Sequence, residues 1–194
     1  MVQTKEIILA SSSPRRRELL QNLGLAFTVI TSDVDESIES ELTPAQIVET
    51  LSLRKAKKVA EQREHGIVIG SDTIVVLDHR VLGKPVDEAE AFQMLLSLQG
   101  REHTVYSGVA LIDASTGREE VAYSFTQVKM RNLTEQEIRA YIASGEPMDK
   151  AGSYAIQGIG ATLVEGIKGD YFTVVGLPLN LTAQLLKKFD ISLL

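Results

Sequence analysis

Apolar residues along the chain follow two patterns, short uninterrupted runs and spacings of three and four. Short runs bounded by turn residues predict buried strands, and apolar residues at helical spacing predict amphipathic helices. The predicted strands cover residues 6–10, 27–31, 67–77, 81–82, 103–113, 120–131, 162–164 and 171–175. The predicted helices cover residues 14–23, 44–64, 88–99, 135–144 and 178–189.

Residues that favour helix N-termini stand before four of these helices. They are Ser13, which precedes Pro14, and then Thr43, Asp87 and Thr134. Their side-chain oxygens can accept a hydrogen bond from the first free backbone N–H groups, and proline suits the first helical position. The caps and the apolar spacing therefore predict the same starting points.

Strands and helices alternate in the first part of the chain, and a long hairpin around residues 115–117 lies in the middle. This order predicts an α/β fold with a mixed sheet rather than a purely parallel one. We see no internal repeat, low-complexity segment or Pro/Gly/Ser linker. Residues 1–194 are therefore expected to form a single domain.

Composition narrows the class of protein. The 194 residues include 20 Lys plus Arg and 26 Asp plus Glu, a net charge of -6, which argues against a general nucleic-acid binder. There are no cysteines, so disulfides and thiolate chemistry are excluded. No apolar run approaches the roughly 20 residues of a membrane span, and the first residues do not resemble a signal peptide. We expect a cytoplasmic protein.

The first candidate for chemistry is residues 11–17, Ser-Ser-Ser-Pro-Arg-Arg-Arg, which follow a predicted strand and open a helix. Cations are unfavourable at the positive end of a helix dipole. Serine hydroxyls, free N–H groups and arginines would converge there on one spot, which favours an anion such as phosphate. A solvated basic turn is the alternative.

The second candidate is Asp72, in the centre of the predicted strand 67–77. A carboxylate in a buried strand needs a partner, a metal ion or a raised pKa. Such a residue can act as a base that activates water, or as a ligand for a hard cation. The alternative is an aspartate that only hydrogen-bonds a neighbouring turn.

Three further features are weaker by themselves. Lys55 ends an apolar helical stripe and Lys84 follows a predicted hairpin, so either could reach a phosphate, but spacing alone favours snorkelling for Lys55 and a surface turn for Lys84. Asp33, Asp35 and Glu36 could supply oxygen ligands for Mg²⁺, although a solvated acidic loop is commoner. His65, His79 and His103 lack metal-ligand spacing.

A glycine-rich stretch covers residues 149–160 and contains Gln157. Its glycines would allow close approach of the backbone to a ligand, or would simply form turns. The Gln157 amide offers both a donor and an acceptor and could read the edge of a nucleobase.

Taken in order, these stretches resemble the Maf family of nucleotide pyrophosphatases, also called septum formation inhibitor proteins. The resemblance covers nearly the whole chain. The matching stretches are residues 9–16, 34–36, 70–75, 82–85, 149–154, 156–158 and 175–178.

The resemblance implies a mixed, elongated sheet flanked by helices, with two lobes and a cleft between them, as in inosine triphosphatase-like folds. It implies a hydrolase that cleaves a nucleoside triphosphate between the α and β phosphates, assisted by Mg²⁺ or Mn²⁺, and a homodimer. Asp72 becomes the expected base, and Glu36 and Asp72 the expected metal ligands. The expected phosphate contacts are Ser11, Ser13, Arg16, Lys55 and Lys84.

The family divides by substrate, and this chain resembles the branch that acts on dTTP and UTP at Arg15, Thr73 and Gln157. A glutamine amide can pair with the N–H and carbonyl groups of a uracil or thymine edge. Two alternatives stay open. One is a regulator of septum formation that binds nucleotides without turnover, and the other is the same reaction on modified purine nucleotides.

Overall fold

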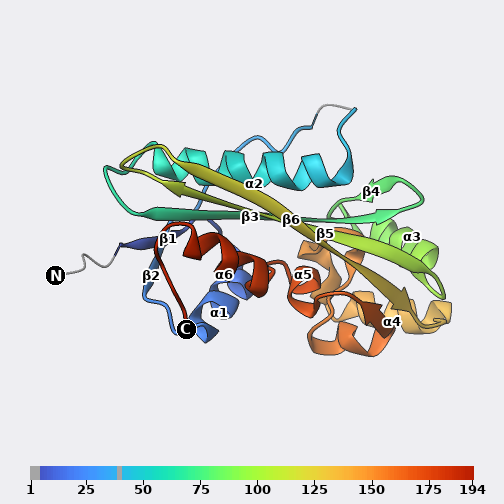
Figure 1. The fold of residues 1–194 in the computed structure, drawn as a ribbon. Helices are drawn as coiled ribbons and strands as arrows, with labels where there is room; N and C mark the ends of the chain where they lie inside the picture. Colours follow the sequence, from blue (N-terminus) through green and yellow to red (C-terminus); the bar gives the residue numbers. More distant parts are fainter. Residues whose placement is uncertain (1–4, 39–40) are drawn as a thin grey trace. The chain divides into compact units, whose positions relative to one another are not determined.

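The computed structural model describes residues 5–38 and 41–194 (Figure 1). Within these residues the strands are β1 (Ile7–Leu9), β2 (Phe27–Val29), β3 (Ile67–Leu77), β4 (Arg80–Leu82), β5 (Glu102–Asp113), β6 (Glu119–Met130) and β7 (Val164–Lys168). The α-helices are α1 (Pro14–Asn22), α2 (Pro44–Ala60), α3 (Glu88–Leu98), α4 (Glu135–Ala143), α5 (Tyr171–Val175) and α6 (Leu179–Lys187). Short 3₁₀ helices cover Glu146–Asp149, Ala151–Ser153 and Gly158–Leu163.

The described strands form one sheet with both parallel and antiparallel pairs. Its order is β2-β1-β3-β5-β6-β7, and β4 pairs with β3. Strand β1 runs parallel to β2 and to β3, whereas the β3–β4 and β6–β7 pairs are antiparallel. The mixed α/β sheet expected from the sequence is therefore confirmed.

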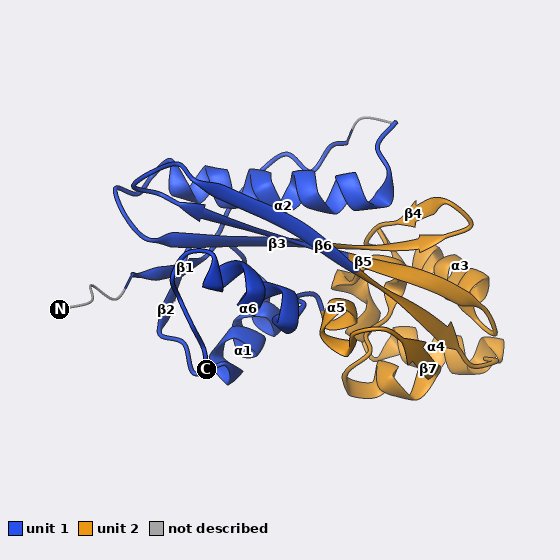
Figure 2. Cartoon of the chain, viewed as in Figure 1, with its two compact units in different colours: residues 1–72, 107–124, 176–194 blue, residues 73–106, 125–175 orange. Residues whose placement is uncertain are grey.

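The chain forms two compact units (Figure 2). Unit 1 contains residues 1–72, 107–124 and 176–194, and unit 2 contains residues 73–106 and 125–175. The boundaries fall inside β3, β5 and β6, so each of these strands contributes residues to both units. The expectation of a single domain over residues 1–194, and that of a cleft between lobes, stay predictions.

In unit 1, helix α2 packs against one face of the strands, and α1 and α6 are drawn on the other face (Figure 2). Ala56 and Val59 of α2 share an apolar cluster with Ile8 and Val68. Gly70 lies beneath α2, where a Cβ atom would collide with the Ser52 carbonyl oxygen and stand 2.8 Å from the Ala56 nitrogen. The absence of a side chain at this position therefore lets the helix backbone lie directly on β3.

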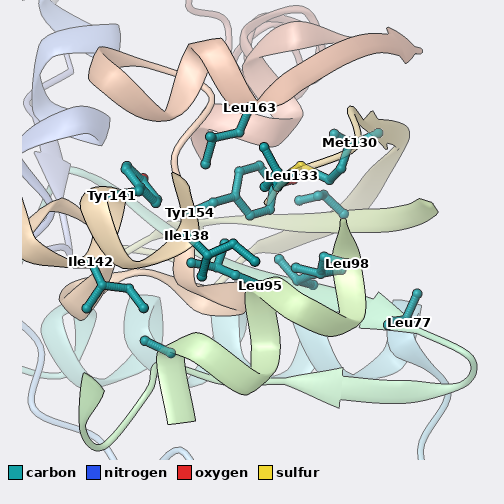
Figure 3. Close-up of a cluster of buried hydrophobic side chains, with 14 residues drawn as sticks. Leu77, Leu95, Leu98, Met130, Leu133, Ile138, Tyr141, Ile142, Tyr154 and Leu163 are labelled. Carbon is teal, nitrogen blue, oxygen red and sulfur yellow. The ribbon is translucent and has the colours of Figure 1, made fainter. Parts of the chain in front are cut away.

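Unit 2 has its own apolar core (Figure 3). Leucines of α3 meet residues of α4 and the strands there, and Tyr141 and Tyr154 contribute their rings. The buried members are Val75, Leu77, Ala91, Leu95, Leu98, Val105, Val128, Met130, Leu133, Ile138, Tyr141, Ile142, Tyr154 and Leu163.

A buried polar pair lies beside this core. His103 Nε2 is 2.6 Å from Tyr154 Oη, and the two rings meet edge to face. His103 Nδ1 is buried with no hydrogen-bond partner among the described residues. Burial lowers the pKa of His103 to about 4 and raises the pKa of Tyr154. The imidazole is therefore neutral at neutral pH.

Two strands expected from the sequence are wrong in part. Residues 171–175 form the helix α5, because Asp170 Oδ2 accepts hydrogen bonds from the backbone N–H (2.8 Å) and hydroxyl (2.9 Å) of Thr173 and so starts a helical turn. Thr162 and Leu163 end a 3₁₀ helix, in which the Thr162 hydroxyl donates to the Ile159 carbonyl oxygen, and the strand begins only at Val164.

Helix α2 also ends at Ala60 rather than near residue 64. The Glu61 N–H still bonds to a carbonyl group four residues back, but the N–H groups of Gln62 and Arg63 bond to carbonyl groups only three residues back. The remaining element predictions hold to within a few residues. Among the described residues, no helix is both long and apolar enough to cross a membrane.

Candidate functional site

The loop after β1 is shaped by its own serines. Ser11 is buried, and its Oγ accepts a hydrogen bond from the Ser13 N–H at 3.1 Å. Ser13 caps α1, and its Oγ accepts from the Arg16 N–H at 3.4 Å. Because Pro14 has no N–H, the first turn of α1 directs few, well-defined donors outward. The loop has the form of an anion site at a helix N-terminus.

Arg16 is held against the chain that leads into α6. Its Nε donates to the Gly176 carbonyl oxygen at 2.8 Å. Burial lowers the pKa of Arg16, the charges of Asp72 and Glu36 oppose this, and Arg15 adds to the lowering. An arginine stays protonated in spite of such a shift. A fixed positive charge therefore lies in the same unit as the buried carboxylate of Asp72.

Asp72 is buried, and its partner is Lys55. The Lys55 ammonium lies 2.6 Å from Asp72 Oδ1 and 2.7 Å from Glu36 Oε1, so one cation links two carboxylates. Lys55 and Asp72 side chains are each 11% exposed, whereas the Glu36 side chain is 58% exposed. We call Lys55, Asp72 and Glu36 the charged cluster. It opens to solvent on the Glu36 side.

The loop that carries Glu36 is fastened to α2. Asp35 accepts hydrogen bonds from the Ser37 N–H (2.8 Å) and hydroxyl (2.7 Å), and these bonds lower the pKa of Asp35. Arg54 Nη1 donates to the Asp35 carbonyl oxygen at 3.0 Å and to that of Ser37 at 2.7 Å. Two neighbouring α2 residues, Arg54 and Lys55, therefore hold the backbone and the side chain of this loop.

Asp72 is placed by its neighbours in β3. The missing side chain of Gly70 brings α2, and with it Lys55, close to the strand. Ser71 is fully buried, and its Oγ lies 2.8 Å from the Gly108 carbonyl oxygen and 3.0 Å from that of Gly176. The Gly176 carbonyl thus serves both Ser71 and Arg16. Ser71 belongs to the small and polar centre of the strand that the sequence singles out around Asp72, but the sequence alone assigns it no role.

Unit 1 holds seven of the ten residues expected at the site: Ser11, Ser13, Arg15, Arg16, Glu36, Lys55 and Asp72. Among these residues, Lys55 contacts Asp72 and Glu36, and Ser13 contacts Ser11 and Arg16. The snorkelling alternative for Lys55 is wrong, because its ammonium is bound inside rather than reaching bulk water.

Unit 2 holds the other three, Thr73, Lys84 and Gln157. Thr73 follows Asp72 in β3 and is half-buried, and Lys84 is exposed in the segment after β4. Gln157 is half-buried with an extended backbone, just before a 3₁₀ helix. Within residues 5–38 and 41–194, its side-chain amide has no hydrogen-bond partner and is available to a ligand.

The charged cluster fits a hard divalent cation in the chemistry of its donors. Asp72 and Glu36 present carboxylate oxygens around one positive charge, that of Lys55. Mg²⁺ is typically bound by one or two carboxylates, with substrate phosphates and water as its other ligands. Across the described part of the chain, no group of three or more His, Asp or Glu residues comes together as a complete metal site.

The fold and the site define a class of α/β protein. Its helix N-terminus is capped by serine and carries a fixed arginine, and the same unit holds two carboxylates bridged by a lysine. The chain belongs to the Maf-like protein family, whose model matches residues 6–189.

Relatives in this family match over almost the full chain. A protein of Pelotomaculum thermopropionicum named dTTP/UTP pyrophosphatase is 55% identical over 98% of this chain and 100% of its own length. Proteins with the same name from Moorella thermoacetica and Bacillus cereus are 54% and 50% identical, over 96% and 97% of this chain and 96% and 92% of their own lengths.

A solved structure is also similar, that of the Staphylococcus aureus Ham1 protein. Its TM-score is 0.47 with 16% identity, over 65% of this chain and 72% of that chain. A similarity this low does not assign the fold, so the inosine triphosphatase-like fold type stays a prediction.

Proposed function

We propose that this chain is a nucleoside triphosphate pyrophosphatase that hydrolyses dTTP and UTP to the nucleoside monophosphate and pyrophosphate. The observation that carries the proposal is the charged cluster, in which the buried carboxylate of Asp72 is held by the Lys55 ammonium, which also binds Glu36. The name dTTP/UTP pyrophosphatase, which relatives at least 50% identical to this chain carry, supports the reaction and the substrates.

The residues around α1 are proposed to bind the phosphates. Ser11 and Ser13 shape the turn, and Arg15 and Arg16 bring two positive charges to the helix N-terminus. The Nε of Arg16 already donates to Gly176, which orients the guanidinium. A fixed guanidinium loses little conformational entropy when it binds a phosphate. Lys84, from unit 2, is assigned a phosphate contact by the family resemblance alone.

Asp72 is proposed as the base. Water hydrolyses the anhydride bond between the α and β phosphates. Asp72 accepts one of the water protons, the new oxygen–phosphorus bond of the nucleoside monophosphate forms from the water oxygen, and pyrophosphate leaves. Lys55 holds Asp72 Oδ1, which fixes the carboxylate and leaves Oδ2 as the oxygen for the proton. The remaining rate enhancement comes from positioning and charge stabilisation at the phosphates, as in other phosphoryl chemistry.

Glu36 and Asp72 are proposed to hold Mg²⁺ or Mn²⁺, since their oxygens match the ligands of these ions. A divalent ion bound there supplies charge neutralisation at the phosphates. Lys55 now lies between the two carboxylates, and substrate phosphate offers its ammonium another anion.

Gln157 is proposed to read the base. Its amide oxygen can accept from the N3–H of uracil or thymine while its NH₂ group donates to a ring carbonyl. The amide has no competing partner among the described residues. Thr73 and Arg15 are also proposed to contribute to the choice of base, and this assignment rests on the family resemblance.

A homodimer and a cytoplasmic location complete the proposal and rest on the family resemblance and on composition. Sedimentation at several protein concentrations would decide the oligomeric state.

The experiment is pyrophosphate release from a panel of canonical and modified nucleoside triphosphates with Mg²⁺ or Mn²⁺, with the nucleotide product identified by chromatography. We expect dTMP from dTTP and UMP from UTP, at rates at least about tenfold above those for purines. Gln157→Glu should lower that preference about tenfold, because a carboxylate has no N–H to donate. Gln93→Glu, at an exposed position of α3, is the matched control.

Three results would contradict parts of the proposal. Turnover of methylated or deaminated purines in place of dTTP and UTP would keep the reaction and overturn the base reading. An unchanged preference in Gln157→Glu would remove Gln157 from it. Nucleotide binding without turnover of any substrate would favour a binding regulator of septum formation.

A further inference from the structure

The glycines after Gln157 surround a carboxylate of the protein itself. Glu146 Oε2 accepts a hydrogen bond from the Ile159 N–H at 3.0 Å, and Glu146 Oε1 accepts from the Gly160 N–H at 2.8 Å. A Cβ atom on Gly158 would stand 2.5 Å from Oε2, and one on Gly160 would stand 2.9 Å from Oε1. Of the two roles left open for these glycines, both apply: Gly158 has the left-handed backbone of a turn, with φ of 65°, and Gly158 and Gly160 allow a close approach, that of Glu146.

The same carboxylate is tied to the segment before Gln157 through Tyr141. The Tyr141 hydroxyl donates to Glu146 Oε1 at 2.9 Å and accepts from the Ala155 N–H at 3.1 Å. Gln157 therefore lies between two anchored points, Ala155 on one side and residues 159–160 on the other. All of these residues belong to unit 2.

Glu146 is itself fixed at its backbone. Its carbonyl oxygen accepts from Lys150 Nζ at 2.8 Å, and its N–H donates to the Ser144 hydroxyl at 3.2 Å. Burial acts to raise the pKa of Glu146, but the hydrogen bonds from Gly160, Tyr141 and Ile159 outweigh it, and the pKa lies below its ordinary value. The group is a charged acceptor at neutral pH, with three donors aimed at it.

We propose that Glu146 is a positioning residue for base selection: by binding the N–H groups of Ile159 and Gly160, together with Tyr141, it fixes the loop that presents the Gln157 amide to the pyrimidine edge. The inference rests on the proposed function, because it assumes that Gln157 reads the base. It assigns to Glu146 a role in discrimination between bases and none in the cleavage step.

Glu146→Gln is the sharpest variant, because it keeps the size of the side chain. Only one of the two terminal atoms of glutamine accepts a hydrogen bond, so its NH₂ group must face the N–H of Ile159 or that of Gly160. The loop loses one anchor, and the apolar core of unit 2 is left intact. Glu165→Gln, at an exposed position of β7, is the matched control.

The experiment measures the dissociation constants of non-hydrolysable α,β-imido-dUTP and α,β-imido-dGTP, kcat and KM for dTTP, and amide hydrogen exchange at residues 155–160. Wild type, Glu146→Gln, Gln157→Ala, the double variant and the control are compared. In Glu146→Gln we expect exchange at Ile159 and Gly160 to be faster by about tenfold. We also expect KM for dTTP to rise about tenfold with kcat within about threefold, and the preference for the uracil analogue to fall by a similar factor.

In the double variant the loss should be no larger than in Gln157→Ala alone, because the two residues act through one contact. Unchanged exchange at residues 159–160 in Glu146→Gln would overturn the inference, and so would faster exchange with an unchanged preference. If Gln157→Ala lowers the preference and Glu146→Gln does not, the inference fails and the proposed base reading stands. If neither the wild type nor any variant prefers the uracil analogue, Gln157 does not select the base, and the inference about Glu146 fails as well.

Discussion

Both units hold a carboxylate through specific polar contacts, but the partners are of different kinds, and Asp72 is buried whereas Glu146 is half-buried. In unit 1 the partner of Asp72 is the Lys55 ammonium, which also binds Glu36. In unit 2 the partners of Glu146 are the backbone N–H groups of Ile159 and Gly160 and the Tyr141 hydroxyl.

The difference separates two uses of the same chemical group. Backbone donors cannot move away without unfolding their loop, so a carboxylate bound by them is a fixed part of the structure. An ammonium at the end of a four-carbon side chain can turn toward another anion. This difference is the basis for our proposals that Asp72 exchanges its partner when phosphate binds and that Glu146 keeps Gln157 in place.

The largest expected effect concerns the close approach of α2 to β3 that brings Lys55 to Asp72. Gly70→Ala places a Cβ atom against the backbone of Ser52 and Ala56, which cannot move without shifting the helix. We expect a loss of about 4 kcal/mol in the free energy of unfolding, measured by urea denaturation, since backbone overpacking is at the upper end of such costs.

Gly166→Ala in β7 is the control, because a Cβ atom there meets nothing within 4 Å. It should change the free energy of unfolding by less than about 1 kcal/mol. Equal effects at the two glycines would contradict the close approach that Gly70 allows.

The next effect is in unit 2 and depends on pH. The folded state lowers the pKa of His103 from 6.5 to about 4, so the unfolded chain binds the proton more readily. The contribution of the neutral, buried imidazole is complete above pH 6.5 and is lost as the pH falls toward about 4, by about 3 kcal/mol.

Urea denaturation between pH 7 and pH 4.5 measures the slope of the free energy of unfolding against pH. His103→Gln should flatten it, and His65→Gln should leave it unchanged because that side chain is 73% exposed. A slope that survives in His103→Gln would assign the acid sensitivity to other groups.

The smallest of the three effects on stability concerns Lys55. Lys55→Met leaves Asp72 buried without its cation, while Glu36 turns to solvent. We expect a loss of about 2 kcal/mol in the free energy of unfolding, below the usual figure for a broken buried pair because one carboxylate is exposed.

Lys57 lies on the same helix as Lys55 and forms an exposed ion pair with Glu119. Lys57→Met removes this pair and should lower the free energy of unfolding by less than about 1 kcal/mol. If the two variants were equally stable, the Lys55–Asp72 pair would be no more than a surface contact, and the contrast with Glu146 would disappear.

Local signals in the sequence predicted the elements well. Ser13, Thr43, Asp87 and Thr134 all cap the helices expected of them. The run of aromatic and β-branched residues at 171–175 was misread as a strand, since Asp170 caps a short helix there and overrides the propensity.

The site was harder to predict, because its contacts join residues far apart in the chain. Asp72 was recognisable as a carboxylate inside an apolar run, and the serine–arginine turn as an anion site. The Lys55–Asp72 pair joins a helix to a strand, and helical spacing alone gave no sign of it. Glu146 was missed for the same reason, although two glycines around Ile159 are a signal that something approaches the backbone closely.

The most direct test of the role of Asp72 is pyrophosphate release from dTTP by Asp72→Asn, beside Asp113→Asn. Asp113 is the matched control, a buried aspartate of β5 in the same unit that caps a turn at Ser115. We expect Asp72→Asn to lose at least about 10²-fold in kcat at an unchanged melting temperature, on the scale of a lost general base, while Asp113→Asn turns over normally. Near-normal turnover by a folded Asp72→Asn would contradict the assignment of Asp72 and with it the role of the charged cluster.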